Sequence, residues 1–214
     1  MTEDATGRSG APAPDTGGAG ADPAPDPRQG AILTAAFGIF ARYGYRKTSM
    51  DDIAREAGMS RPALYQYFRN KEDIFRSMVA AYFDAAIADV AAALERPGPP
   101  DQTLAAAFAA RDGAVMEMLM TSPHGAELLD AGLSVSADLI HAKEAEICAL
   151  LAGWLRRRGA AGELSPAVAG ADPQALAETI MDALKGIKRP ELGPEVYAAR
   201  RSQLAHLFGR ALAV

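Results

Sequence analysis

Residues 45–75 constrain the fold of this chain more than any other stretch, because they hold two short helical patterns separated by a tight turn. Ile53, Ala54 and Ala57 are spaced to place apolar groups on one face of a first helix. Gly58 follows, and a glycine adopts the positive φ that ends a helix at low cost. The first helix is therefore predicted to end at this glycine.

The second helical pattern begins with a favourable N-cap, Ser60, and carries Pro62 in its first turn, where a missing N–H does no harm. Leu64 and Phe68 are four residues apart, so both face the first helix. Two short helices joined by a glycine-containing turn of about three residues are typical of the helix-turn-helix. The outward positions are Pro62, Tyr65, Gln66 and Arg69, flanked by Arg61 and Tyr67.

The outward face of the second helix has the chemistry of a DNA-reading surface. One helix fits the major groove of DNA, arginine can read guanine or hold phosphate, and glutamine can read adenine. Asn70 is positioned to cap the next helix, with Asp73 three residues later. Lys71 would then lie at a helix N-terminus, where backbone N–H groups favour a phosphate.

The run from Ile32 to Phe75, about a fifth of the chain, closely resembles the DNA-binding domain of TetR/AcrR-type regulators. The spacing is unbroken across the matching residues. These are Phe40, Gly44, Thr48-Ser49-Met50, Ile53-Ala54, Ala57-Gly58-Met59-Ser60, Leu64-Tyr65-Gln66-Tyr67-Phe68 and Asn70-Lys71-Glu72.

The resemblance implies particular roles on DNA. Thr48, Tyr67 and Lys71 would hold phosphates, although Thr48 could be only a helix cap, and Arg61, Tyr65 and Gln66 would lie near base edges. The DNA-binding candidates are Thr48, Ser49, Met50, Ser60, Arg61, Pro62, Tyr65, Gln66, Tyr67 and Lys71. The partner would be a double-stranded, pseudo-palindromic operator read by a homodimer.

Composition predicts an all-α fold. Apolar residues make up 49% of the chain and alanine dominates them, which favours helices, and no convincing alternating strand pattern is present. The single cysteine, Cys148, excludes an intramolecular disulfide. We expect a cytoplasmic protein, because there is neither a secretory signal pattern nor an uninterrupted apolar stretch of about 18 residues.

The net charge of −5 is unevenly distributed. Residues 28–75 hold eight basic and five acidic residues, whereas residues 1–27 hold one basic and five acidic. Positive charge is therefore concentrated on the helix-turn-helix. The excess is modest, so specific contacts and dimerisation should matter more than a broad basic field.

We predict three segments. Residues 1–27 read as a disordered tail, because they lack the apolar side chains needed to offset ordering entropy; the alternative, a minor-groove arm, would rest on Arg8 alone. Residues 28–75 form an N-terminal three-helix helix-turn-helix domain. Residues 76–214 form a C-terminal helical domain for effector binding and dimerisation.

Helical periodicity, together with residues that favour helix starts and ends, predicts the remaining elements. For the helix after Gly44, Ser49 with Asp52 and Thr48 with Asp51 are competing capping boxes. Beyond the helix-turn-helix pair, we expect helices at about Pro27–Gln29 to Tyr43, Lys71–Leu94, Asp101–Met120, His124–Ala131, Ser134–Arg158, Asp172–Pro173 to Ile187 and Pro194–Leu212, with Gly132 as an interruption and Gly159–Gly170 as a loop.

No catalytic, cofactor or metal motif is visible. His124, His141 and His206 lack ligand spacing, and no phosphate-cradling glycine loop or nucleophile elbow occurs. Cys148 lies on an apolar helix face and is expected to be buried and inert. We therefore predict that the chain is not an enzyme.

Family resemblance implies a small effector in the C-terminal domain. The methionine-rich run at 116–120 is suited to an adaptable apolar pocket, although ordinary core packing is the favoured interpretation for any single residue. The pocket candidates are Phe83, Phe108, Met116, Met118, Leu119, Met120, Leu128, Leu133 and Trp154.

Members of this family pair their last two helices into a four-helix bundle, so Pro173–Ile187 and Pro194–Leu212 are the expected dimer interface. One apolar stripe comprises Leu176, Ile180, Ala183, Leu184 and Ile187. A less regular stripe comprises Val196, Ala199 or Arg200, Gln203, Leu204, Leu207 and Leu212. The alternative is that both helices pack within one chain.

Together these features predict a repressor that a small apolar or amphipathic effector releases from its operator. The long helix Lys71–Leu94 would transmit the change to the spacing of the two recognition helices. An activator of the same fold and a helical interaction module without DNA binding are the alternatives, and a helical enzyme would need a polar constellation that is not visible.

Overall fold

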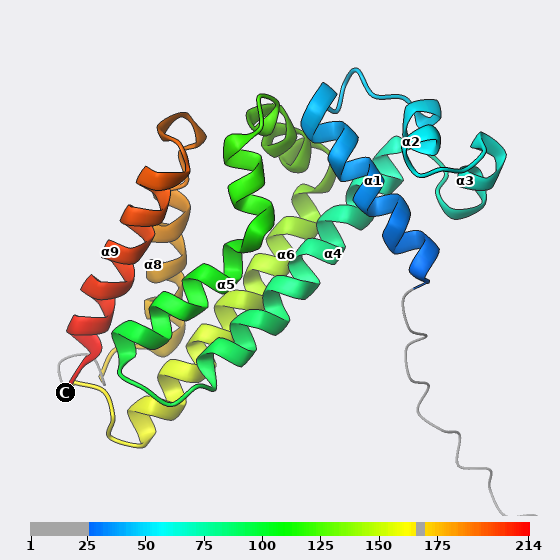
Figure 1. Cartoon of the computed structure of the whole chain (residues 1–214). Coiled ribbons are helices and arrows are strands. Elements are labelled where there is room, and N and C mark those ends of the chain that lie inside the picture. Colours follow the sequence, from blue (N-terminus) through cyan, green and yellow to red (C-terminus); the bar gives the residue numbers. More distant parts are fainter. Residues whose placement is uncertain (1–25, 166–169) are drawn as a thin grey trace, which may run out of the picture.

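The computed structural model describes residues 26–165 and 170–214, and all its regular elements in those ranges are helices (Figure 1). The tail predicted over residues 1–27 lies outside them except for its last two residues, and Pro27 already begins a helix. The elements are α1 (Pro27–Tyr43), α2 (Met50–Glu56), α3 (Arg61–Tyr67), α4 (Lys71–Leu94), α5 (Pro100–Thr121), α6 (Gly125–Ala160), α8 (Pro173–Gly186), the 3-10 turn η1 (Pro190–Leu192) and α9 (Pro194–Leu212).

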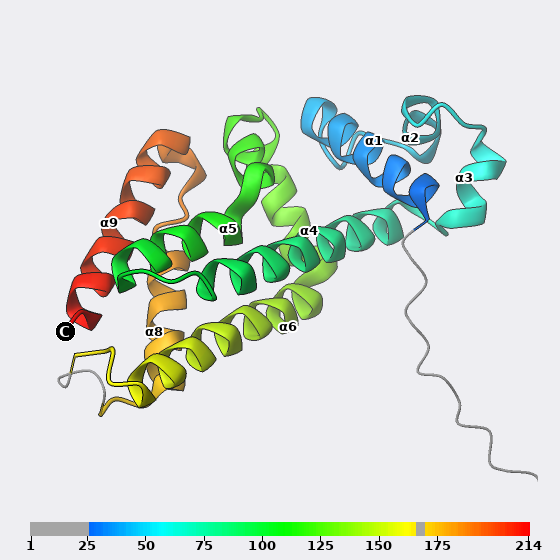
Figure 2. The same ribbon diagram turned by 60° about the horizontal axis from the view of Figure 1, so that its bottom comes forward.

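The helices form an elongated molecule with the helix-turn-helix at one end. Figures 1 and 2 show α1, α2 and α3 grouped at that end, while α4 and α6 run side by side toward the end that holds α8 and α9. An N-terminal helix-turn-helix followed by a helical domain is the all-α architecture predicted from the sequence, which is confirmed.

The helix-turn-helix is held by local caps. Ser49 and Asp52 form the capping box of α2, which decides between the two registers left open by the sequence. Gly58 has a φ of 67° after α2, and the Ser60 hydroxyl accepts a hydrogen bond from the Ala63 amide at the start of α3. The turn therefore has the geometry that its sequence predicts.

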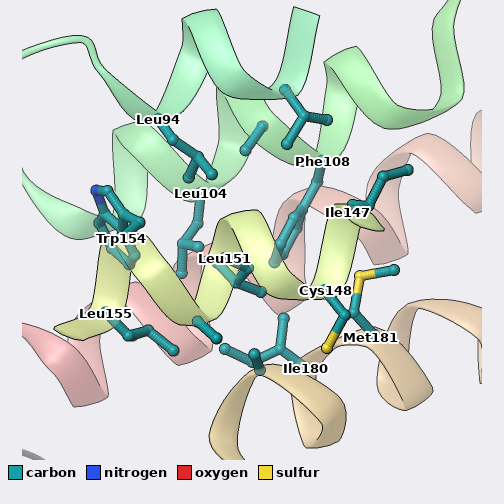
Figure 3. Packing of buried hydrophobic residues seen from close by; sticks show 14 of the residues in the cluster. Leu94, Leu104, Phe108, Ile147, Cys148, Leu151, Trp154, Leu155, Ile180 and Met181 are labelled. Atoms are coloured by element: carbon teal, nitrogen blue, oxygen red, sulfur yellow. The ribbon is translucent and has the colours of Figure 1, made fainter. Parts of the chain in front are cut away.

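Two apolar cores stabilise the molecule. The first joins α1–α3 to the beginnings of α4 and α6, and includes Ile32, Phe40, Ile53, Leu64, Phe68, Ile74 and Phe75. The second lies between α4, α5, α6, α8 and α9, and Figure 3 shows Leu104, Phe108, Leu151, Trp154 and Ile180 packed in it. Cys148 is buried in this second core, where desolvation raises the pKa of its thiol, as befits a structural cysteine.

Helix α5 is bent at Gly113, whose φ of 56° and ψ of −173° are not helical. The bend interrupts the helical hydrogen-bond ladder. The Tyr82 hydroxyl of α4 lies 3.0 Å from the carbonyl oxygens of both Arg111 and Asp112, where it can donate to either. The Tyr82 hydroxyl thus replaces part of the helical hydrogen bonding that is lost at the bend.

Helix α6 is interrupted later than predicted. We expected separate helices at His124–Ala131 and Ser134–Arg158 with Gly132 between them, whereas α6 spans Gly125–Ala160 with a kink at Ser136. The irregularity lies at Ser136, which has a φ of −137°. Glycine lowers helix propensity without forbidding the helix, and tertiary packing overrides it here.

Helices α8 and α9 both pack within the chain. The predicted stripe of α8 is buried mainly against α6, with Ile180 and Leu184 almost inaccessible. Helix α9 packs along α5, which covers Leu212. Ile180 and Leu184 are thus core residues of one chain, which corrects their assignment to a dimer interface. Pairing of Pro173–Ile187 and Pro194–Leu212 with a second copy stays a prediction.

One helix, α4, is long and apolar enough by length and composition to cross a membrane, with a mean hydropathy of 1.5 over the qualifying window. A core helix of a helical domain passes the same test. Helix α4 makes extensive contacts with α5 and α6, so its apolar side chains have a structural role in the domain core.

Candidate DNA-binding surface and effector cavity

Helix α3 presents its outward side chains to solvent. Arg61, Pro62 and Gln66 are exposed, and 43% of Tyr65 is accessible. The Arg61 guanidinium lies 3.2 Å from Asp51 Oδ2 and 5.5 Å from the centre of the Tyr65 ring. These contacts hold the arginine across the first turn of α3, next to the residues that would face base edges.

Thr48, Ser49 and Met50 have local structural partners. The Thr48 side chain is buried and its hydroxyl donates to the Gly44 carbonyl at 2.7 Å. Ser49 is exposed but its hydroxyl is engaged by Asp52 in the capping box, and Met50 packs partly against the first core. The hydroxyl of Thr48 therefore faces the protein, contrary to the phosphate-holding role implied by resemblance.

Lys71 also points into the protein. Its ammonium donates to the carbonyl oxygens of Tyr45 at 2.8 Å and Thr48 at 3.0 Å, and lies 4.4 Å from the centre of the Tyr45 ring. Partial burial lowers the pKa of Lys71. The side chain thus ties the start of α4 to the loop before α2, rather than extending outward for a phosphate. Tyr67 is likewise partly buried against the first core.

Two exposed cations that the sequence analysis did not select lie in the loop before α2. Within residues 26–165 and 170–214, neither Arg46 nor Lys47 has a carboxylate oxygen within 4.0 Å of its side-chain nitrogens. In contrast, Arg42, Arg55 and Arg69 are paired with Glu56, Asp52 and Asp73. Arg46 and Lys47 come directly before Thr48-Ser49, and this position was the clue in the sequence to a role on DNA.

A cavity of about 1130 Å³ lies between α1, α4, α5, α6 and α8. Most of its surface is apolar. Its lining includes Leu33 and Phe37 from α1, Met78 and Phe83 from α4, Met116, Leu119 and Met120 from α5, Leu128 and Leu133 from α6, and the polar residues Arg111, Glu144, Lys185 and Lys188. The cavity therefore touches both the helix-turn-helix domain and the helical domain.

The structure places the predicted pocket residues in three environments. Phe83, Met116, Leu119, Met120, Leu128 and Leu133 line the cavity. Phe108 and Trp154 belong to the second core. Met118 is 46% exposed and faces away from the cavity. Since successive residues of a helix point in different directions, a methionine-rich run cannot place all its members in one pocket.

The turn between α5 and α6 is fastened to the helix-turn-helix domain. The Ser122 hydroxyl donates to the Ala41 carbonyl at 2.8 Å, and the Glu127 carboxylate accepts from the Arg46 amide at 2.8 Å. This hydrogen bond, with weaker help from His124, lowers the pKa of Glu127. Ser122 also lines the cavity, so one residue of the cavity wall is hydrogen-bonded to α1.

The profile of the family described as bacterial regulatory proteins, tetR family, matches residues 32–78, which span α1–α3 and the beginning of α4. Residues 32–78 therefore form a TetR-type DNA-binding domain. FasR, an HTH-type transcriptional activator of Mycolicibacterium smegmatis, is 36% identical over 85 residues. That match covers 40% of this chain but only 39% of FasR, well under two thirds of its length.

The similarity extends over more of the chain in other relatives. EthR, an HTH-type transcriptional regulator of Mycolicibacterium smegmatis, is 29% identical over 204 residues, covering 88% of this chain and 87% of EthR. The SmeT–triclosan complex is similar with a TM-score of 0.61 at 21% identity, covering 87% of this chain and 91% of SmeT. Similarity at that identity shows a shared TetR-type fold. These relatives are regulators and not enzymes.

Proposed function

We propose that this protein is a cytoplasmic transcriptional repressor of the TetR family that binds an operator as a homodimer and leaves it when a small effector enters the cavity. The observation that carries the proposal is the exposed face of α3, with Arg61, Tyr65 and Gln66 at one tip of an elongated molecule. Residues of these types, on a helix of this size, are suited to the major groove.

Outside α3, the exposure and position of Arg46 and Lys47 support phosphate binding by these two residues. Both side chains are exposed and precede the N-terminus of α2, which itself favours an anion. Thr48 and Lys71 would contribute indirectly, because their hydrogen bonds to Gly44, Tyr45 and Thr48 carbonyls shape this loop. Phosphate contacts of this kind set affinity and register, whereas α3 sets sequence preference.

The cavity supports control by a ligand. A ligand in it would touch α1 directly and would also contact α4 and the end of α5, which is hydrogen-bonded to the helix-turn-helix domain through Ser122. A ligand that prefers one spacing of the two α3 helices by a few kcal/mol would shift the population accordingly. SmeT, which shares this fold, has been solved with the small molecule triclosan.

The decisive experiment measures fluorescence anisotropy of the full chain on duplex DNA flanking its own gene, with excess nonspecific competitor. Gln66→Ala and Tyr65→Ala should each weaken specific binding about tenfold or more, because losing a base contact costs about 1–3 kcal/mol. Gln102→Ala removes an exposed glutamine from the start of α5 and should bind as the wild type does. Equal loss in all three variants, or none, would contradict DNA reading by α3.

An activator remains a second candidate because FasR carries that name. The two are separated by a reporter gene placed behind the bound site. Deleting the protein should raise reporter output if it is a repressor. A fall in output would instead make it an activator that uses the same DNA-binding surface.

A further inference from the structure

One end of the cavity carries a cluster of charged side chains, whereas most of the remaining wall is apolar. At the bend of α5, the lining includes Arg111, Glu144, Lys185 and Lys188. Only about 5% of the Arg111 side chain is accessible to solvent. Burying a cation this deeply is costly unless partners compensate it. Each charged group at this end therefore requires a partner of opposite charge or a hydrogen-bond partner.

The carboxylates near the bend already have cationic or hydroxyl partners. Asp112 accepts from the Tyr197 hydroxyl at 2.6 Å and from Arg201 at 3.0 Å, and lies 3.2 Å from Arg111. Glu144 lies 2.9 Å from Arg111 through one oxygen and 3.0 Å from Lys185 through the other. Glu191, which also lines the cavity, is paired with Arg189 at 2.7 Å. All three carboxylates are therefore engaged by groups other than Lys188.

Two donors at this end remain without such compensation. In the described ranges 26–165 and 170–214, no carboxylate oxygen lies within 4.0 Å of the Lys188 ammonium. The Arg111 Nε is buried and has no hydrogen-bond partner there. Burial and the nearby Arg111 lower the pKa of Lys188 to about 8, which reflects the same unmatched positive charge.

We propose that the cavity binds an amphipathic monocarboxylate whose anionic head contacts Lys188 and Arg111 and whose apolar body lies along Phe83, Met116 and Leu128. The proposal rests on the proposed function, because it specifies the class of effector. One ammonium and one guanidinium N–H match the two oxygens of a carboxylate, whereas a doubly charged phosphate would need more donors. The volume suits a drug-sized or slightly larger molecule.

The head group is tested by isothermal titration calorimetry of the full chain with dodecanoate and with dodecanol, both below their aggregation limits. Wild-type protein should bind dodecanoate at least tenfold more tightly than dodecanol. Lys188→Met keeps the side-chain length without the charge, so it should remove most of that preference. Lys143→Met is the matched control, because Lys143 pairs with Asp84 and Glu146 and does not line the cavity; it should keep the preference.

Proton uptake gives a second readout that loss of folding would not imitate. A carboxylate bound beside Lys188 would raise the pKa of that lysine, so binding near pH 9 should take up protons in the wild type and in Lys143→Met but not in Lys188→Met. Titrations in buffers of different ionisation enthalpy measure this uptake. The charged and titratable groups that share this end are Tyr82, Arg111, Asp112, Glu144, Lys185 and Glu191.

Four results would overturn the proposal: no binding of dodecanoate, equal affinity for dodecanol, an unchanged preference in Lys188→Met, or the absence of proton uptake by the wild type. Operator binding measured in parallel without ligand separates this inference from the proposed function. Intact, Gln66-dependent operator binding would leave the repressor proposal standing even if the carboxylate proposal failed.

Discussion

At the scale of single residues, the helix caps of the helix-turn-helix were predictable from the sequence, whereas the orientation of two of its polar side chains was not. Ser49 and Ser60 cap α2 and α3, as their positions predict, because a cap depends only on neighbours a few residues away. Thr48 and Lys71 differ, since their partners are carbonyls supplied by the loop between α1 and α2. Their inward orientation could not be derived from spacing within a helix.

The capping box predicts the effect of Ser49→Ala. Losing the side-chain cap should lower the free energy of unfolding by about 1 kcal/mol, and Ser49→Thr should recover most of it. Urea unfolding followed by circular dichroism measures the difference. Ser202→Ala, on the exposed face of α9, should change stability by no more than a few tenths of a kcal/mol. A neutral Ser49→Ala would mean that the α2 cap does not stabilise the domain.

The exposed cations Arg46 and Lys47 should determine part of the salt dependence of DNA binding. For each phosphate contact removed by Arg46→Ala or Lys47→Ala, the slope of log K against log salt should become shallower by about 0.9. Relative affinities for different operator sequences should stay nearly constant. Anisotropy titrations at several salt concentrations test this, with Arg96→Ala, far along the chain beyond α4, as the control. An unchanged slope would remove both residues from the DNA-binding surface.

Lys188 should make stability depend on pH. Its folded-state pKa of about 8 lies below the ordinary value of 10.5, so between these pH values the unfolded state holds more protons than the folded state. Stability contributed at this site should therefore rise as the pH increases from about 8 toward 10.5. Urea unfolding across that range should show a larger rise in the wild type than in Lys188→Met. Equal curves would mean that the lysine titrates normally in the fold.

At the scale of elements, helix ends were more predictable than helix interiors. The bounds of α1, α4 and α9 follow from caps, prolines and glycines that can be read directly along the chain. The bend of α5 at Gly113 and the continuity of α6 through Gly132 were not predicted. A glycine within a helical pattern permits a bend, but packing against neighbouring helices decides whether one forms.

The bend of α5 depends on Tyr82. Tyr82→Phe would leave the carbonyl groups of Arg111 and Asp112 without this donor, and should lower the free energy of unfolding by about 1–3 kcal/mol. Tyr43→Phe, which alters a tyrosine that is 57% exposed, should cost almost nothing. Chemical unfolding of both variants gives the comparison. If the two variants were equally stable, the hydroxyl of Tyr82 would not support the bend.

At the scale of the whole molecule, the apolar stripes of the last two helices are buried to different degrees. The α8 stripe is buried against α6. On α9, Val196 and Leu207 stay 41% and 64% exposed, and their separation of eleven residues, about three turns, puts them on one face. An exposed apolar face of this kind is suited to pairing with a second copy, so we place the proposed dimer surface chiefly on α9.

Leu207→Glu should therefore weaken self-association. Placing a carboxylate on an apolar contact between two copies should raise the dimer dissociation constant at least tenfold and reduce operator affinity with it. Sedimentation velocity over a range of protein concentrations measures the change. Met118→Glu, at a methionine that is 46% exposed on α5, should leave association unaffected. Unchanged association in Leu207→Glu would exclude the outward face of α9 as the interface.

The helical fold class, the caps, the turn at Gly58 and the outward chemistry of α3 follow from the sequence, because each depends on residues within one or two helical turns. The bend of α5, the inward orientation of Lys71, and the cavity with its charged end follow only from the tertiary structure. These features bring Tyr82, Arg111, Glu144 and Lys188 together from α4, α5, α6 and the segment after α8. Such contacts join residues far apart in the chain, and no periodicity along one helix records which distant helix will pack against it.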